Sequence, residues 1–403
     1  MNGCLSDIRV LELGQVLAGP YAGMILGDLG ADVIKVESPM GGDSARRTPP
    51  HFYKGESIYF MALNRNKRSV VIDLTTKEGR QVFYDLARKS DIVIDNLRHG
   101  VVEQLEVNHE ILLKYNPRII SCSITGYGSD SSDRFKPSFD LMVQARGGGM
   151  SLTGMPGGPP LRMGVSISDH VAGIYAVTGV LAALYESART GKGRRIEVPL
   201  FSTMLSLLSY EAALHLYSGD VPGPVGSGHR SLIPYNAVPT ADGYIVIDAH
   251  LPKFWSALCG ALRIEALEND PRFRTLEVRN RNRDELLKIL NEVFATKTSR
   301  EWLAILDVAG VPCAPINDLK AALEDEVTRD LKMVVDIEHT GVGLTFRAVG
   351  NPIGMPDSGE TQYSSPPLLG EHTEAVLREV AGYGDDKIEL LIRDGVVAVK
   401  PEA

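Results

Sequence analysis

The chain has 403 residues and a formal net charge of −9, with 44% hydrophobic and 23% charged residues. This length exceeds what one hydrophobic core usually accommodates, so we expect two domains. The composition is that of an ordinary soluble globular protein. The negative net charge argues against a nucleic-acid partner, which would require a basic surface.

The cysteines and the apolar segments give expectations about the compartment. The N-terminus has no basic segment followed by an apolar one, so no signal peptide is expected. The longest apolar run, Val171 to Tyr185, is shorter than the roughly 20 residues that a membrane span requires, so it is interpreted as a core helix and no membrane partner is expected. Four widely separated cysteines lack metal or redox spacing and are interpreted as reduced, buried thiols of a cytoplasmic protein: Cys4, Cys122, Cys259 and Cys313.

The N-terminal segment has the pattern strand, loop, helix, strand. Residues 8–13 predict a buried strand, Tyr21 to Leu29 a helix with Pro20 near its first position, and Asp32 to Glu37 a second strand. This βαβ unit begins an open α/β sheet. A nicotinamide cofactor is rejected, because the glycines at positions 14, 19 and 23 lack the G-x-G-x-x-G spacing.

Strand and helix patterns then alternate as far as residue 217. Strands are predicted at 70–74, 91–96, 119–124 and 195–200, and helices at 77–89, 101–105, 110–115, 171–185 and 201–217. Such alternation predicts a mostly parallel sheet covered by helices. In these sheets ligands bind beyond the carboxyl ends of the strands, where Asn96 and Gly126 to Gly128 lie.

The composition changes at Ser218 to Arg230, a stretch rich in Gly, Pro and Ser that is interpreted as a linker or mobile loop. A second module follows, with a strand at 244–247 and helices at 253–262, 282–295 and 299–309. The chain then returns through strands near 334–338 and 344–347 and a helix near 371–381. We therefore expect an α/β fold with a large Rossmann-like domain (1–215 and 330–403), a small α+β domain (225–325) and linkers at 216–224 and 326–329.

The segment Gly164 to His170 contains Ser168-Asp169, shortly before the long apolar helix. Asp or Ser at this position is typical of a helix N-cap, and spacing alone favours that structural interpretation. In the alternative interpretation, the free N–H groups and the helix dipole keep the Asp169 carboxylate ionised. An ionised carboxylate that faces a cleft can act as a covalent nucleophile.

Several short segments together resemble the class III coenzyme A-transferase family (CaiB/BaiF type), which includes formyl-CoA transferase, carnitine CoA-transferase and succinyl-CoA-dependent dicarboxylate CoA-transferases. Each segment is weak alone, but their order and spacing are highly specific and cover nearly the whole chain. The resemblance is carried by Leu11-Glu12-Leu13, Ala18-Gly19-Pro20, Gly30 to Glu37, Asn64 to Ser69, Asp95-Asn96, Thr125 to Gly128, Phe139-Asp140 with Gln144-Ala145, Thr190 to Gly193, Pro239 to Gly243 and Leu368 to Thr373.

The resemblance implies that Asp169 is the nucleophile. Its carboxylate would attack an acyl-CoA thioester to give a mixed anhydride, which the released thiolate would convert into an aspartyl-CoA thioester. An acceptor acid would then reverse these steps. The substrates are CoA thioesters and small carboxylic acids, no metal or redox cofactor is expected, and members of the family form interlocked homodimers.

The resemblance also implies binding residues. Lys67 and Arg68 could meet phosphates or form a solvated charge pair. For CoA it points to Val16, Ala18, Ile72, Asp73, Asn96, Leu97, Lys136, Phe139 and Asp140. For the acyl group it points to Leu17 and to a glycine loop with Gly226, Gly228, His229 and Arg230, whose alternative interpretation is a plain linker.

The sequence departs from formyl-CoA transferase at three positions that bear on the substrate. Leu17 replaces a glutamine that holds the acyl group, and Ser38 and Gln104 replace arginines near CoA. These departures disfavour formate and oxalate, and Arg230 could bind the second carboxylate of a succinyl-CoA-like diacid. Carnitine transfer, formyl or oxalate transfer, and a catalytically silent CoA-binding protein remain alternatives. An α-methylacyl-CoA racemase is less favoured, because Phe139 stands where those enzymes have a proton-transferring histidine.

Overall fold

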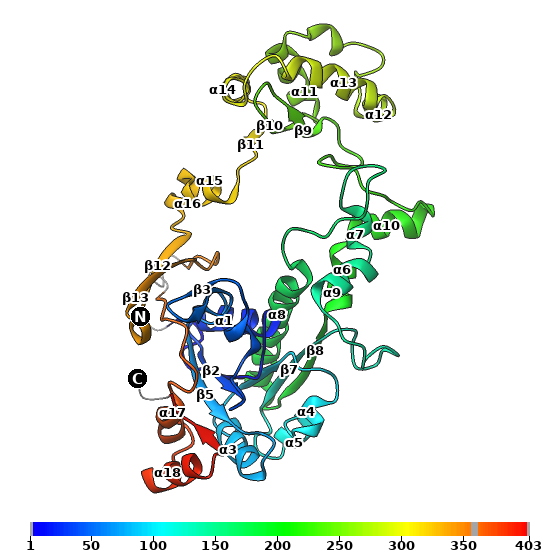
Figure 1. Ribbon diagram of the computed structural model, residues 1–403. Helices are drawn as coiled ribbons and strands as arrows, with labels where there is room; N and C mark the ends of the chain where they lie inside the picture. The colour runs from blue at the N-terminus through cyan, green and yellow to red at the C-terminus, as the bar shows by residue number, and fades with distance from the viewer. Residues whose placement is uncertain (1–2, 356–361, 401–403) are drawn as a thin grey trace. The chain divides into compact units, whose positions relative to one another are not determined.

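The computed structural model describes residues 3–355 and 362–400, which separate into two units (Figure 1). The first unit contains the chain up to Gly149, Arg162–Tyr217 and the chain from Arg329 onward, and the second contains Met150–Leu161 and Ser218–Thr328. Residues 150–161 were predicted to belong to the large domain, but they belong to the second unit. The backbone N–H of Gly226 donates a hydrogen bond to the carbonyl oxygen of Gly154 at 3.0 Å, which ties this stretch to the second unit.

The first unit is built on a seven-stranded sheet in the order β14-β5-β2-β1-β6-β7-β8. Its strands are β1 (Arg9–Glu12), β2 (Asp32–Glu37), β5 (Lys67–Ile72), β6 (Ile92–Asp95), β7 (Ile120–Thr125), β8 (Arg194–Pro199) and β14 (Val397–Ala398). All neighbouring strands pair in parallel except β14, which is antiparallel to β5. The strand order reverses between β1 and β6, which is where open α/β sheets bind ligands.

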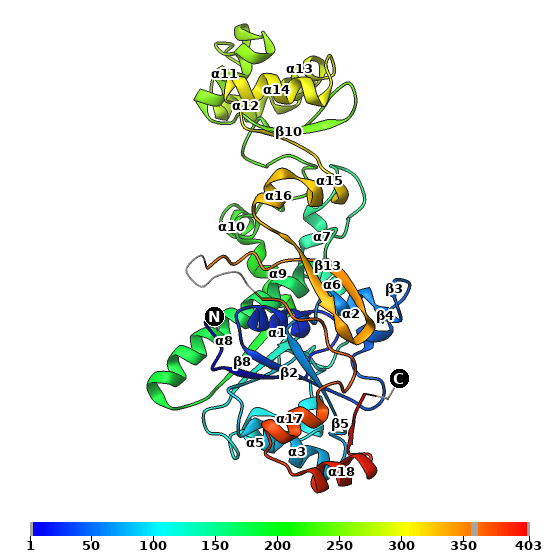
Figure 2. The ribbon, with the colours of Figure 1, turned by 90° about the vertical axis from the view of Figure 1, so that its left-hand side faces the viewer.

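Helices cover both faces of this sheet (Figures 1 and 2). Alternate residues of each strand enter two different cores, as Val10 and Leu11 of β1 do. One core holds α3 (Lys77–Ala87), α5 (His109–Leu112), α17 (Thr373–Glu379) and α18 (Asp385–Arg393), and the other holds α1 (Ala18–Asp28), α6 (Asp140–Arg146), α8 (Ile167–Thr190) and α9 (Leu200–Leu207). This arrangement confirms the predicted helix-covered, mostly parallel sheet.

Helix α8 is long and apolar enough to cross a membrane by length and composition alone. In the first unit it packs against α1, β7 and β8, and its buried residues include Ala172, Ala176 and Val180. The sequence pattern placed its start at Val171, whereas the helix begins at Ile167 and contains Asp169 in its first turn. The expected helix over 201–217 is divided into α9 and α10 (Ser209–Ser218).

The second unit contains a three-stranded antiparallel sheet covered by helices. Its strands are β9 (Tyr235–Pro239), β10 (Tyr244–Asp248) and β11 (Cys313–Pro315), and its helices include α11 (Pro252–Leu262), α12 (Leu276–Arg281), α13 (Arg283–Phe294) and α14 (Ser299–Ala309). The core is formed by residues such as Ile245, Trp255, Phe294 and Trp302. A separate hydrophobic core is what allows this segment to fold as a unit of its own.

Short elements complete the chain. They are β3 (Phe52–Tyr53), β4 (Glu56–Ser57), α2 (Ile58–Met61), α4 (Val101–Gln104), α7 (Gly149–Leu152), α15 (Leu319–Glu324), α16 (Glu326–Asp330) and the hairpin of β12 (Val334–His339) with β13 (Leu344–Val349). The four cysteines are free thiols. Cys122 and Cys259 are buried as expected, but Cys4 is exposed because it lies near the start of the chain, before the first strand.

Candidate active site

A pocket of about 410 Å³ lies in the first unit beyond the carboxyl ends of β1, β6 and β7. Its position at the reversal of strand order is where this sheet type is expected to bind a ligand. The lining residues are Gln15, Val16, Leu17, Ala18, Ser44, Asn96, Leu97, Arg98, His99, Val101, Ile124, Thr125, Gly126, Arg134, Phe135, Lys136, Ser138, Phe139, Asp169 and Leu200. The pocket therefore brings Asp169 together with most of the residues predicted to bind CoA.

The start of α8 is held by a neighbouring carboxylate. Asp140, the first residue of α6, accepts hydrogen bonds at one oxygen from the backbone N–H of Ser168 at 3.0 Å and from its hydroxyl at 2.6 Å. Its other oxygen accepts a bond from Gln144 Nε2 at 2.7 Å. Asp140 thus takes the part of an N-capping side chain for α8. The predicted capping role of Asp169 is wrong, because Asp169 is itself within the helix.

The Asp169 carboxyl is partly buried beside a second acid. Burial, and then the charge of Asp140, raise the pKa of Asp169 from 3.8 to about 7, although Arg162 opposes the shift. The helix terminus was expected to keep this group ionised, but loss of water and a like charge outweigh it and raise the pKa. A carboxylate with a raised pKa is a stronger base and a better nucleophile once it is ionised.

Tyr59 belongs to the surroundings of this carboxyl. Burial and then the charge of Asp169 raise the pKa of the Tyr59 hydroxyl above its ordinary value. The hydroxyl is thus protonated at neutral pH and available as a hydrogen-bond donor. No sequence pattern singles out Tyr59, because it follows a long loop rather than a motif.

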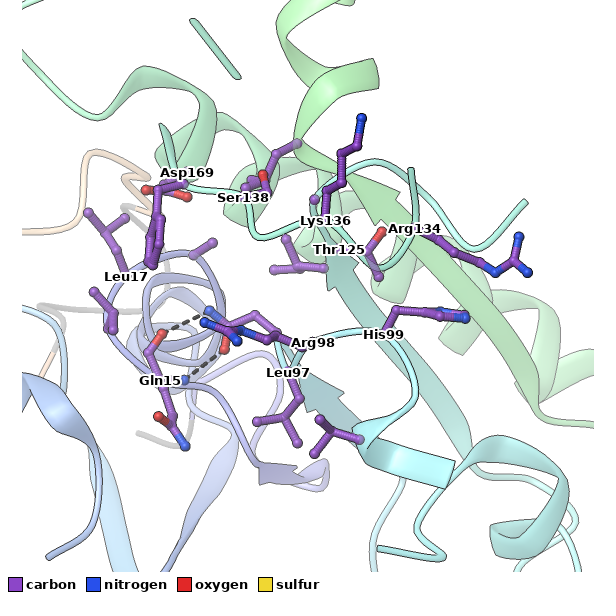
Figure 3. Close-up of a pocket in the computed structure, with 18 of the residues that line it drawn as sticks. Gln15, Leu17, Leu97, Arg98, His99, Thr125, Arg134, Lys136, Ser138 and Asp169 are labelled. Atoms are coloured by element: carbon purple, nitrogen blue, oxygen red, sulfur yellow. Dashed lines mark hydrogen bonds between the residues drawn. The ribbon is translucent and has the colours of Figure 1, made fainter. Parts of the chain in front are cut away.

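The opposite side of the pocket is cationic. Figure 3 shows His99, Arg134 and Lys136 at a distance from Asp169 and Leu17, on the other side of the view. Lys136 forms an ion pair with Asp133 at 2.9 Å, and the guanidinium of Arg134 lies over the Phe135 ring at 5.0 Å. Within residues 3–355 and 362–400, neither Arg98 nor Arg134 has a carboxylate at ion-pair distance. These guanidinium groups are able to bind an anion.

Sequence reasoning missed Arg98, His99 and Arg134. The first two follow Asn96-Leu97 directly at the end of β6, so the strand-end rule could have found them. Arg134 lies in a loop whose path no local pattern predicts.

Three predicted CoA residues do not line the pocket. Ile72 is buried in β5 and pairs with Val397. Asp73 follows that strand, and its carboxylate accepts hydrogen bonds from the backbone and side chain of Thr75 at 3.0 and 2.6 Å. Asp140 does not line it either, because its carboxylate is occupied with the start of α8.

The suggestion that Lys67 meets phosphates is wrong. Its side chain is fully buried, its ammonium lies 2.6 Å from a Glu12 carboxylate oxygen, and it donates to the carbonyl oxygen of Pro20 at 2.8 Å. Arg68 forms ion pairs with Asp32 at 2.6 Å and Glu379 at 3.0 Å. Both side chains serve the structure of the sheet layer.

The predicted glycine loop lies in the second unit. There the guanidinium of Arg230 donates a hydrogen bond to the carbonyl oxygen of Gly223, and the N–H groups of Ser231 and Leu232 donate to His229 Nδ1 at 3.1 and 3.2 Å. Gly226 has a φ of 65°, a conformation that glycine adopts without strain. The loop is thus folded on itself within its own unit.

Comparison with known proteins identifies the family. The family model described as CoA-transferase family III matches residues 5–373. The chain belongs to CoA-transferase family III. The mouse protein named succinyl-CoA:glutarate CoA-transferase is 36% identical over 98% of this chain and 90% of its own. The Haloarcula hispanica protein named succinyl-CoA:mesaconate CoA-transferase is 35% identical over 96% of this chain and 99% of its own.

A solved structure supports the same family. A CaiB/BaiF family protein from Brucella suis superposes with a TM-score of 0.84 and is 36% identical, covering 94% of this chain and 100% of the other. The resemblance drawn from the short segments is thereby confirmed, and the chain is a class III CoA-transferase. In the part of the chain that the structure describes, no group of three or more His, Cys, Asp or Glu residues is arranged to hold a metal ion.

Proposed function

We propose that this enzyme transfers coenzyme A from succinyl-CoA, or a similar diacid thioester, to a small dicarboxylic acid. The observation that carries the proposal is a partly buried Asp169 carboxyl in a pocket with cationic groups on its far side, in a chain whose relatives are named as succinyl-CoA-dependent transferases. The proposal places the acyl group near Asp169 and the phosphates of CoA near Arg98 and Arg134.

In the proposed reaction, an Asp169 oxygen attacks the thioester carbonyl carbon and the C–S bond breaks. The products are CoA thiolate and a mixed anhydride. The thiolate then attacks the carbonyl carbon of Asp169, which releases the donor acid as a carboxylate and leaves an aspartyl-CoA thioester. The acceptor carboxylate repeats these two steps in reverse order. No net proton or electron is exchanged, and each step breaks one acyl bond as it forms another.

The residues around Asp169 suit this sequence of steps. Asp140 and burial make the carboxylate more basic, and the start of α8 offers backbone N–H groups near the same carboxyl. Phe139 lines the pocket and cannot carry a proton, which argues against racemisation at an α-carbon.

The acid preference is proposed from two positions. The apolar side chain of Leu17 offers no hydrogen bond to a very small acyl group such as formyl. The guanidinium of Arg230 is suited to bind a second carboxylate bidentately. Carnitine, formate and oxalate transfer remain the competing activities.

The experiment is a transfer assay with succinyl-CoA and a panel of acceptors. Succinate, glutarate, mesaconate, citramalate and malate should accept CoA far better than formate, butyrate or carnitine. Exchange of labelled succinate into succinyl-CoA should occur without loss of an α-proton to solvent. A best acceptor that is a monocarboxylate or carnitine would reject the diacid assignment, and α-proton loss without exchange would reject CoA transfer.

We further propose a homodimer with interlocked chains. One face of α8 stays exposed and apolar, with Ile174 at 47%, Leu181 at 38% and Tyr185 at 69% of full exposure, and Leu216 and Tyr217 of α10 are exposed as well. Exposed apolar side chains gathered on one helix face are typical of a protein interface. Light scattering should give twice the chain mass of 43.8 kDa. A monomer at micromolar concentration would reject the proposal.

A further inference from the structure

The loop between β1 and α1, residues 14–17, is attached to charged side chains beneath it. The ammonium of Lys35 donates a hydrogen bond to the carbonyl oxygen of Gly14 at 2.7 Å, and Asp43 Oδ1 accepts one from the N–H of Val16 at 3.0 Å. Lys35 and Asp43 are joined at 3.0 Å, and their side chains are 0% and 1% exposed. One buried ion pair therefore fixes the peptide groups on both sides of Gln15.

Val16 is held in a conformation that its side chain opposes. Its φ is 64°, in the left-handed region, which costs about 1–2 kcal/mol for a residue with a Cβ and is a genuine outlier for a β-branched one. Such strain persists only where the surroundings impose it, and it is often found at functional sites. Here the surroundings are Asp43 on the Val16 N–H and Asn96, which exchanges two hydrogen bonds with the Gln15 backbone at 2.7 and 2.8 Å (Figure 3).

The ion pair stays charged over the working pH range. Burial alone would lower the pKa of Lys35, but the carboxylates of Glu12, Asp43 and Glu37 outweigh it and hold that pKa above its ordinary value. Burial alone would raise the pKa of Asp43, but Lys35 and the N–H groups of Val16 and Ala45 hold it below its ordinary value. The Lys35–Asp43 ion pair therefore holds the loop throughout this pH range and does not act as a pH switch.

The Lys35–Asp43 pair belongs to a larger buried cluster in which cations and anions are equal in number. It joins the cations Lys35, Lys67 and Arg46 to the anions Glu12, Asp43 and Glu37. Buried ion pairs contribute little to stability compared with apolar residues of similar size, because both charges lose their hydration. A role in fixing one local conformation is therefore a better explanation of the Lys35–Asp43 pair than stability.

Val16, Leu17 and Ala18 all line the pocket that contains Asp169, and Figure 3 shows Leu17 on the same side of the view as Asp169. We propose that Lys35 and Asp43 are positioning residues, which hold Val16 in its left-handed conformation so that the start of α1 faces the reacting acyl group. The proposal rests on the pocket being the acyl-CoA site. A displacement of about 1 Å in such a wall can cost about 100-fold in rate.

The test begins with Asp43→Ala, which removes the acceptor of the Val16 N–H. We expect kcat with succinyl-CoA to fall by about 10-fold or more. We expect Val16→Gly in the same chain to recover much of kcat without recovering the melting temperature, because glycine keeps a positive φ without being held. Asp43→Asn keeps an acceptor atom but loses the charge, so its kcat should lie between that of wild type and that of Asp43→Ala. If Asp43→Ala does not fold, the comparison of Asp43→Asn with and without Val16→Gly gives the same decision.

The matched control is at the other end of the same helix. Asp28, the last residue of α1, forms a buried ion pair with Arg65 at 2.6 Å, with side-chain exposures of 1% and 4%. Asp28→Asn should lower the melting temperature about as much as Asp43→Ala does and leave kcat within about twofold of wild type. A twofold fall in kcat corresponds to a rise of about 0.4 kcal/mol in the activation barrier. Equal losses of kcat in Asp28→Asn and Asp43→Ala would overturn the proposal, as would failure of Val16→Gly to restore kcat.

A second measurement separates this proposal from the proposed function. Hydrogen exchange of the peptide covering residues 14–18 should accelerate in Asp43→Ala relative to wild type, and should be unchanged in Asp28→Asn. Exchange is measured on the whole protein without substrate, so it decides the positioning claim even if the wild type transfers no CoA. Unchanged exchange in Asp43→Ala would overturn the claim whatever the activity.

Discussion

Replacing Asp169 by asparagine should stabilise the protein at neutral and alkaline pH while abolishing its activity. The pKa of Asp169 is raised to about 7 by burial and by Asp140, so ionisation of this group costs free energy only in the folded state. One pKa unit corresponds to about 1.4 kcal/mol, which gives about 4 kcal/mol for the whole difference from 3.8. The group is partly exposed to solvent, so we expect about 2–3 kcal/mol at pH 8.

The pH dependence of this stabilisation has a definite sign. The folded state holds its proton up to about pH 7, whereas the unfolded chain loses it near pH 4. The contribution of Asp169 to wild-type stability is therefore lost as the pH rises through this range, and above it Asp169→Asn is the more stable protein. Below about pH 4 Asp169 is protonated in both the folded and the unfolded wild type, so the extra stability of Asp169→Asn should disappear.

The assay is urea unfolding followed by circular dichroism at a series of pH values from 5 to 8. The midpoint for Asp169→Asn should exceed that of wild type most at pH 8, and the difference should shrink stepwise towards pH 5. Asp133→Asn is a control of opposite sign, because hydrogen bonds from Lys136 and Arg146 hold the pKa of Asp133 below its ordinary value. An Asp169→Asn protein that is no more stable than wild type at pH 8, or whose advantage is independent of pH, would refute the electrostatic account.

Three further predictions follow from the site. Asp140→Ala leaves the buried Ser168 N–H and hydroxyl without their acceptor, so urea unfolding should show a loss of about 2 kcal/mol; it also removes a like charge, so the limb of the kcat/KM profile near pH 7 should move to lower pH, and an unchanged limb would exclude the coupling. Arg98→Ala with Arg134→Ala should raise KM for succinyl-CoA by about 10-fold or more, with no effect on a succinyl-pantetheine thioester that lacks the phosphates; equal effects on both thioesters would reject phosphate binding. Arg230→Ala should raise KM for glutarate more than for butyrate in steady-state assays. An equal rise in KM for both acids would show that Arg230 does not bind the second carboxylate.

The elements that the sequence predicted best are those whose pattern is local. Apolar strands followed by amphipathic helices identified the parallel sheet, and the strand-end rule selected Asn96, which lines the pocket. The long helix was found from its apolar run, but its first turn was missed, because Ser168 and Asp169 are polar residues that resemble a cap. The hydrogen bond from the Ser168 N–H to Asp140, a residue far away in the sequence, supports this first turn.

The errors concern charges whose partners are distant in sequence. Lys67 was expected either to meet phosphates or to form a solvated charge pair with Arg68. Its side chain is instead buried, with Glu12 as its ion-pair partner and the Pro20 carbonyl oxygen of α1 as an acceptor. Glu12 and Lys35 in otherwise apolar strands were the available signal of a buried cluster, since charged residues are rarely fully buried without partners. The third member, Asp43, comes from a loop, and no sequence pattern brings it beneath Val16.

Covalent capture of Asp169 is the most direct test of the account. The wild-type enzyme is incubated with succinyl-CoA without an acceptor, treated with hydroxylamine and digested, and the peptides are analysed by mass spectrometry. The account predicts a hydroxamate on Asp169 that forms only with the thioester present and is absent in Asp169→Asn. Hydroxylamine modification at another residue, or full turnover without any modification of Asp169, would contradict it.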